Sequence, residues 1–147
     1  MATNMKENGF EMLIVRYLVD NNHYEEGLNA EYNKTYAIDE VRLFRFLNDT
    51  QHKKMQELRI EESEIEKKKF FDRLSRKLSD DGVINIIRKG LKYKNHTLDF
   101  YMVQPSDGNV EAAKSYNKNI FSVTRQLRYS GDYGKLALDL CIFLNGL

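Results

Sequence analysis

The sequence predicts an α/β protein in which helices come first and a β-sheet follows. Before residue 82, apolar side chains recur at helical spacing, three or four residues apart. After residue 90 the pattern changes to alternation, and β-branched and aromatic residues gather in residues 120–130. The last run, residues 136–144, is apolar on both faces except at Asp139, as expected of a central strand covered on both sides. We therefore expect the core strand of the sheet to come last.

Composition limits the class of protein. The chain has 147 residues, 41% of them apolar and 31% charged, which is typical of a soluble globular domain or part of one. The single cysteine, Cys141, excludes an internal disulfide and favours a reducing compartment; we expect it to be a small core residue. No apolar run approaches the length of a membrane span, and the polar N-terminus lacks a signal peptide. The prediction is a cytoplasmic protein with no membrane partner.

The first predicted helix covers residues 9–20, and a loop over residues 20–27 follows it. The apolar side chains of this helix lie at helical spacing: Phe10, Leu13, Ile14, Tyr17 and Leu18.

Two further helices are expected before residue 60. Asp39 can cap one of them, and its buried face would hold Leu43, Phe44 and Leu47. The other is expected to begin after residues 48–50.

The clearest local signal is Ser63 followed by Glu66, the pattern of a capping box at the start of a helix. Gly82 can end this helix, and its mixed charges indicate a solvated outer face. Its predicted buried side chains are Phe70, Phe71, Leu74 and Leu78.

The pattern after residue 90 indicates strands. Residues 91–103 alternate about an Asn95–His96 turn, and Pro105 would close that strand. Residues 108–119 are expected to form a turn with a short helix or loop. A strand over residues 120–130 would then connect through a Gly-rich turn to the final run.

Two aspartates lie in predicted strands. Asp99 has Thr97 and Tyr101 as its same-side neighbours, so it can face water. Asp139 lies in the apolar final run, where an ionised carboxylate needs a buried cationic side chain, several N–H donors or a metal ion. From these residues alone, a structural ion pair and a metal or catalytic ligand remain equally open.

The pair Asn145–Gly146 follows the final run directly. Asn-Gly after a strand is the strongest short-range signal of a hairpin, because a type I′ turn needs positive φ at both central residues. We therefore expect a return strand beside Asp139, and we expect the chain to be a fragment that lacks it.

Several common sites are excluded. The three histidines lie far apart and one cysteine is present, so a zinc site is not indicated. Neither a Walker loop nor a dinucleotide fingerprint occurs. Residues 85–135 hold nine basic and four acidic residues, a modest surplus of five positive charges that is compatible with a polyanion partner.

The sequence resembles the N-terminal domain of the R (HsdR) subunit of bacterial type I restriction enzymes. The matching stretches run from about Phe10 to the C-terminus, and the most specific are the last two: FEMLIVRYLV, YAIDEVRLFRFLNDTQ, VINIIRKGLKYKNHTLDFYMVQPSDGN, NIFSVTRQLRYS and LDLCIFLNGL.

The resemblance implies a PD-(D/E)xK nuclease-like core, a mixed β-sheet flanked by helices, that cleaves double-stranded DNA with Mg²⁺. Asp139 matches the motif aspartate and the Asn-Gly pair matches the turn before the E-x-K strand. Residues 1–147 would then be the N-terminal part of the endonuclease domain, incomplete at its C-terminus. ATP would act only through motor domains absent from this chain, and the methyltransferase and specificity subunits would be partners.

The resemblance also suggests roles for individual residues. Glu11 borders the core on the side of its helix shared with Ile14, Val15 and Leu18, and nucleases of this class often supply a helix glutamate. A first-turn glutamate is, however, also favoured by the helix dipole, so Glu11 has a purely structural alternative. Gln126 could buttress the sheet, and no role is assigned to it. DNA-backbone contacts are expected from four basic residues: Arg125, Arg128, Lys92 and Lys94.

The alternative function is a non-catalytic DNA-binding or subunit-docking module, with Asp139 in a structural buried ion pair. In the first interpretation the chain belongs to an enzyme, a type I site-specific deoxyribonuclease subunit, although the fragment alone should be inactive. An E-x-K strand downstream would favour the nuclease.

Overall fold

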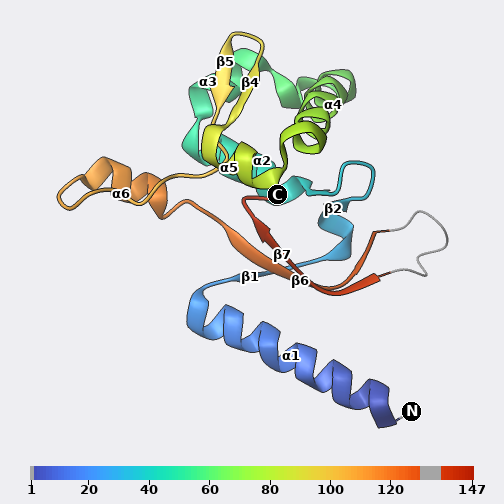
Figure 1. The fold of residues 1–147 in the computed structure, drawn as a ribbon. Coiled ribbons are helices and arrows are strands. Elements are labelled where there is room, and N and C mark those ends of the chain that lie inside the picture. Colours follow the sequence, from blue (N-terminus) through green and yellow to red (C-terminus); the bar gives the residue numbers. More distant parts are fainter. Residues whose placement is uncertain (1, 130–136) are drawn as a thin grey trace. The chain divides into compact units, whose positions relative to one another are not determined.

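The computed structural model describes residues 2–129 and 137–147 (Figure 1). The chain divides into two compact units. Unit 1 comprises Met1–Val41 and Ile120–Leu147, and unit 2 comprises Arg42–Asn119. Two compact units of one chain can belong to one domain, so the single-domain expectation stays a prediction. Each unit is described by itself.

Unit 1 contains a small mixed sheet in the order β1-β6-β7. Its strand β6 lies in the middle, parallel to β1 and antiparallel to β7. The expected α/β class with a mixed sheet is therefore confirmed, but the core strand is β6 and not the last strand. The elements of unit 1 are α1 (Ala2–Asn22), β1 (Glu25–Gly27), the 3₁₀ turn η1 (Asn29–Glu31), β2 (Tyr32–Asn33), β3 (Ile38–Asp39), β6 (Phe121–Arg128) and β7 (Ala137–Leu144).

Helix α1 contacts β1 and β6, beside which it runs in Figure 1. It is longer than predicted, and the side that it buries differs from the predicted one. Glu11 and Val15 are buried, whereas Phe10, Leu13 and Tyr17 are each more than 60% exposed. The apolar residues of α1 lie on two overlapping sides of the helix. The side that packs on the sheet is the one on which Glu11 contacts polar residues of β6.

Strand β7 is not the doubly covered strand that its sequence predicts. It lies at the edge of the described sheet, and Leu138, Asp139 and Ile142 are exposed. Within β7, Phe143 is the buried residue, and the centre of its ring lies 5.9 Å from that of Tyr32. The predicted Gly-rich turn before β7 lies outside the described residues.

The Asn145–Gly146 turn has the predicted geometry. Asn145 has a φ of 52° and Gly146 a φ of 88°, the two positive values that a type I′ turn needs. The N–H of Leu147 donates to the carbonyl of Leu144 at 3.1 Å, and the N–H of Leu144 donates back at 3.0 Å. These reciprocal bonds close a two-residue hairpin turn.

The same turn is tied to two distant segments of unit 1. The side-chain Oδ1 of buried Asn145 accepts the Ile120 N–H at 2.6 Å, and the Asn145 N–H donates to the Ile120 carbonyl at 2.7 Å. The carbonyl of Gly146 accepts the Asp39 N–H at 2.9 Å. The turn therefore joins the start of β6 to the end of β3.

Unit 2 is mainly helical, with one short hairpin. Helix α2 begins in the last residues of unit 1 and continues into unit 2. The elements are α2 (Glu40–Thr50), α3 (His52–Leu58), the 3₁₀ turn η2 (Ile60–Glu62), α4 (Glu64–Asp81), α5 (Val83–Lys89), β4 (Leu91–Tyr93), β5 (His96–Leu98) and α6 (Val110–Tyr116).

Helix α4 begins after Ser63 and ends at Gly82, as predicted. Half of the predicted capping box is formed, because the Glu66 carboxylate accepts from Lys69 and Lys94. The Ser63 Oγ accepts the Glu66 N–H at 3.2 Å, and the N–H of Gly82 donates to the Leu78 carbonyl at 2.9 Å. Phe70, Phe71 and Leu74 are buried as predicted, whereas Leu78 is only half-buried. Ring centroids of Phe44, Phe70, Phe71 and Tyr93 lie 5.4–6.2 Å apart in this core. The predicted buried face of α2 is likewise confirmed.

The hairpin of unit 2 is shorter than predicted. It turns at residues 94–95, one position earlier than expected, and β5 ends at Leu98, well before Pro105. The main-chain N–H and carbonyl of Asp99 pair with the side-chain amide of Gln51, both at 2.8 Å. The amide of Asn119 pairs with Met102 in the same way. The side-chain amides of Gln51 and Asn119 thus form the main-chain hydrogen bonds that a neighbouring strand would otherwise form with residues 99 and 102.

Candidate functional site

Asp139 lies in the middle of β7 and is exposed to solvent. The expectation of a buried carboxylate is therefore wrong, because β7 is an edge strand in the described structure. Asp99 is exposed, as predicted. Gln126 of β6 and Asp139 of β7 lie between the flanking pairs Arg125–Leu140 and Leu127–Leu138, so the register sets them opposite each other although they are not themselves a ladder pair.

Gln126 connects this point of the sheet to helix α1. Its Nε2 lies 2.9 Å from Oε1 and 3.0 Å from Oε2 of Glu11, so the amide donates to the Glu11 carboxylate. The Arg125 Nη2 lies 3.5 Å from Glu11 Oε2. Glu11 is only 7% exposed, and these two residues supply the donor and the cation that a buried carboxylate requires.

Glu11 is therefore not stabilised by the start of its helix. Helix α1 begins at Ala2, so Glu11 lies beyond the first turn, where the helix dipole no longer acts appreciably. The dipole explanation is wrong, and the contacts with β6 replace it. We call Glu11, Asn29, Arg125 and Gln126 the Glu11 cluster.

Asn29 of η1 belongs to the Glu11 cluster because its side chain binds main-chain groups of β6. Its Nδ2 donates to the Gln126 carbonyl at 3.2 Å and approaches the Arg125 carbonyl at 3.5 Å. Its Oδ1 accepts the Arg128 N–H at 2.9 Å. Gln126 has a φ of 48°, a left-handed conformation inside a strand. Asn29 thus satisfies the polar main-chain groups on both sides of this irregular residue.

The four predicted DNA-contacting residues are divided between the two units. Arg125 and Arg128 belong to β6 of unit 1, and Lys92 and Lys94 to the hairpin of unit 2. Arg128, Lys92 and Lys94 are exposed, whereas Arg125 has a side chain 25% exposed and engaged with Glu11. Arg125 is therefore first a partner of Glu11.

Lys94 is held by its surroundings in unit 2. Its Nζ lies 3.2 Å from Glu66 Oε2 and 5.5 Å from the centre of the Tyr93 ring. Hydrogen bonds from Lys69 and then Lys94 lower the pKa of Glu66. This ammonium group already has an anionic partner, so a phosphate would have to compete with Glu66.

Cys141 follows Asp139 on the same strand. Burial raises the pKa of its thiol, which disfavours the thiolate that a nucleophile or metal ligand requires. The residue is half-buried and is not among the buried core residues, so the prediction of a small core residue is wrong.

Carboxylate oxygens such as those of Asp139 and Glu11 are the ligands that Mg²⁺ prefers. Among the described residues, however, no group of three or more acidic, histidine or cysteine side chains could enclose a metal ion. The expectation of a Mg²⁺ site therefore stays a prediction.

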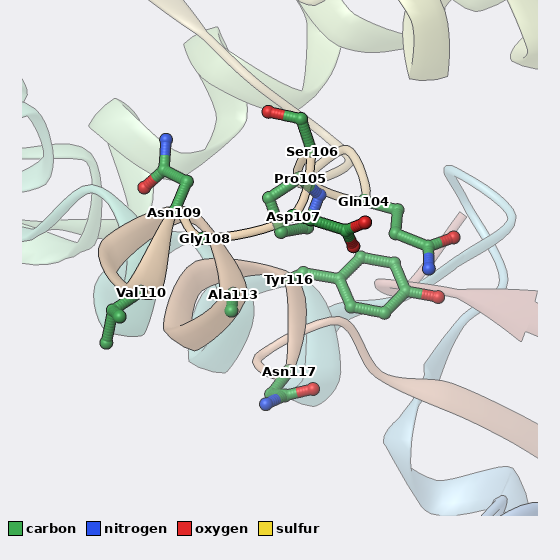
Figure 2. A pocket seen from close by; sticks show the side chains of 10 residues that line it. All are labelled: Gln104, Pro105, Ser106, Asp107, Gly108, Asn109, Val110, Ala113, Tyr116 and Asn117. Atoms are coloured by element: carbon green, nitrogen blue, oxygen red, sulfur yellow. The ribbon is translucent and has the colours of Figure 1, made fainter.

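Unit 2 contains a hollow of about 320 Å³ beside α6 (Figure 2). Figure 2 shows Tyr116 of α6 below the loop that carries Gln104 and Asp107. Asp107 and Tyr116 are the ionisable side chains among its lining residues. With no second carboxylate or cation in the lining, the hollow offers an open polar surface and no converging acid and base. None of the site residues predicted from the sequence lines this hollow.

No protein-family model, curated protein or solved structure matches the chain. Separately, none of the helices within the described residues is both long enough and apolar enough to cross a membrane.

The sequence pointed to some members of the Glu11 cluster and missed another. It singled out Glu11 and Arg125 and left Gln126 without a role. Asn29 was missed, because an asparagine in a loop is common and its partners lie about a hundred residues away. No local signal could have identified it.

Proposed function

We propose that this chain contributes to the Mg²⁺ site of an endonuclease that cleaves double-stranded DNA, as part of a type I restriction enzyme R subunit with a PD-(D/E)xK-type core. The observation that carries the proposal is the register of β6 and β7. It sets Asp139 across from Gln126, and Gln126 holds the Glu11 carboxylate. Gln126 thus connects an acidic side chain of α1 to the strand position opposite a second acidic residue, Asp139.

The roles of the two carboxylates differ. Asp139 is exposed and can offer its oxygens to a cation. Glu11 accepts from Gln126 with both oxygens, and Oε2 also lies 3.5 Å from Arg125 Nη2, so Oε1 is the oxygen with more accepting capacity left. Bound Mg²⁺ would supply an activated water and offset the charge that develops on the leaving oxygen. The neighbouring Arg125 compensates the Glu11 charge, so we assign Glu11 the accessory role.

The type I′ turn supports the same proposal. Asn145 and Gly146 reverse the chain immediately after the strand that carries Asp139. A strand following Leu147 would run beside Asp139, where the resemblance expects the E-x-K residues. The ATP-driven motor domains, the methyltransferase and the specificity subunit belong to the same proposal.

Contacts with the DNA backbone would come from exposed basic side chains. Arg128 lies two residues beyond Gln126 on β6, close to the proposed site. Lys92 and Lys94 provide exposed positive charge on unit 2. Contacts of this kind increase affinity without reading the base sequence, and they weaken with salt.

The decisive experiment is the Asp139→Ala substitution in an R subunit that carries this segment. We expect DNA cleavage to be abolished while ATP hydrolysis continues. Asp99→Ala, which removes another exposed carboxylate, is the matched control and should cleave normally. Undiminished cleavage by the Asp139 variant would remove this residue from the site. The isolated chain should not cleave DNA efficiently, and robust Mg²⁺-dependent nicking by it would contradict that expectation.

The second candidate is a non-catalytic DNA-binding or docking module. A buried ion pair favours it, but the pair joins Glu11 to Arg125 and does not involve Asp139. The sequence encoded after Leu147 discriminates the two: an E-x-K strand supports the nuclease, and its absence supports the module.

A further inference from the structure

Gln126 adopts a main-chain conformation that its residue type does not favour. Its φ of 48° lies in the left-handed region, although the pairing with β7 continues in the same register on both sides. Side chains other than glycine enter this region at an energetic cost, and such residues persist where their surroundings hold them.

Asn29 supplies that support. Its amide nitrogen binds the carbonyl of Gln126 itself, and its amide oxygen binds the N–H of Arg128, two residues further on. One side chain therefore brackets the irregular residue. The contact joins η1 to β6, and the two residues, Asn29 and Gln126, lie 97 positions apart in the sequence.

The consequence of the irregular conformation appears at the other end of the Gln126 side chain. The residue is exposed overall, yet its amide reaches both oxygens of buried Glu11. A donor shared almost equally by both oxygens holds the carboxylate end of the Glu11 side chain at one position. Arg125 approaches one oxygen alone and at a longer distance, 3.5 Å.

We propose that Gln126 is a positioning residue that orients the Glu11 carboxylate at the point of the sheet opposite Asp139, and that Asn29 holds Gln126 in the conformation required. The inference rests on the proposed function, because it assigns a purpose to the orientation of Glu11. Gln126 acts through Glu11 and need not touch DNA or metal itself.

The contact is tested first in this chain by a double-mutant cycle in denaturant unfolding. Gln126→Ala and Glu11→Ala are compared with the double variant, and the unfolding equilibrium constants should be coupled by about fivefold or more. Gln126→Gly separates the side chain from the backbone, because glycine removes the amide but accepts positive φ. Coupling below about twofold would overturn the inference.

The positioning role is tested next by cleavage in an R subunit that carries this segment. Glu11→Gln should lower the rate, and Gln126→Ala should lower it about tenfold, since small misplacements near reacting atoms are costly. In the Glu11→Gln background, Gln126→Ala should add nothing further. Asn29→Ala should reproduce the Gln126→Ala defect.

The outcomes separate the two proposals. Additive losses at Gln126 and Glu11 would show that Gln126 acts independently and would overturn the positioning role while leaving the nuclease intact. Full cleavage by both Asp139→Ala and Glu11→Gln would overturn the proposed function, and the positioning role with it. If Gln126→Ala fails to fold, its unfolding midpoint will show it. The cleavage rates are then compared between Gln126→Gly and the unsubstituted chain.

Discussion

The two units of this chain stabilise themselves in different ways. Unit 2 is built on apolar packing around rings such as Phe44 and Phe70, with capped helices at its rim. Unit 1 buries polar groups, Glu11 and Asn145 among them, and leaves large apolar side chains exposed on α1 and β7. A close-packed apolar core leaves no space for a ligand, whereas directed polar contacts hold side chains at defined positions near the surface. The candidate site accordingly lies in unit 1.

The largest effect is expected in the core of unit 2. Phe70→Ala removes a ring that is fully buried against Phe44, Phe71 and Tyr93, and should lower the free energy of unfolding by about 3–5 kcal/mol. Ile65→Ala on the same helix, where the side chain is 69% exposed, should change it by less than about 0.5 kcal/mol. Urea unfolding measures both. Equal effects would mean that this core is not the stabilising centre of unit 2.

The next effect tests whether polar contacts hold unit 1 together. Asn145→Ala leaves the Ile120 N–H without its 2.6 Å acceptor and places alanine at positive φ, so we expect a loss of about 2–4 kcal/mol. Asn145→Gly keeps the turn accessible and should recover about 1 kcal/mol of that loss. If alanine and glycine were equally harmless in thermal unfolding, the turn would be dispensable.

A smaller effect distinguishes the two sides of helix α1. Val15→Ala removes a buried side chain and should cost about 1–2 kcal/mol. Leu13→Ala, two residues earlier on the exposed side, should cost less than about 0.5 kcal/mol. The reverse order in chemical denaturation would show that the other side of α1 packs on the sheet.

The smallest effect concerns charge on unit 2. Lys69 and Lys94 lower the pKa of Glu66 in the folded chain. Stability from this carboxylate is therefore present above the pKa of an unfolded glutamate and is lost as the pH falls through the lower folded value. Because the Glu66 side chain is 26% exposed and its two lysine partners are surface residues, solvent screens the interaction and the loss should be slight. The pH dependence of the unfolding midpoint should be flatter in Glu66→Gln, and an unchanged slope would contradict the assignment.

The same contrast explains what the sequence could predict. Ser63, Gly82 and the Asn145–Gly146 turn act through neighbours in the chain, so their patterns carry the information. The buried side of α1 and the edge position of β7 depend on which distant segment packs there. Glu11 was placed near the core from its helix position, but its partner Gln126 lies at the other end of the sequence. The burial of Asp139 was wrong because apolar neighbours along a strand do not tell how many strands surround it.

The division of the chain has a consequence for its folding order. Unit 1 is assembled from two segments, and the whole of unit 2 lies between them in the sequence. Unit 2 is built mostly from local contacts and can fold while β6 is still distant, whereas β1 and α1 must wait for β6 to arrive. The entropy of closing so long a loop grows only logarithmically with its length, and a folded unit 2 would already have shortened the flexible part. We therefore expect the Glu11 cluster to be among the last contacts to form.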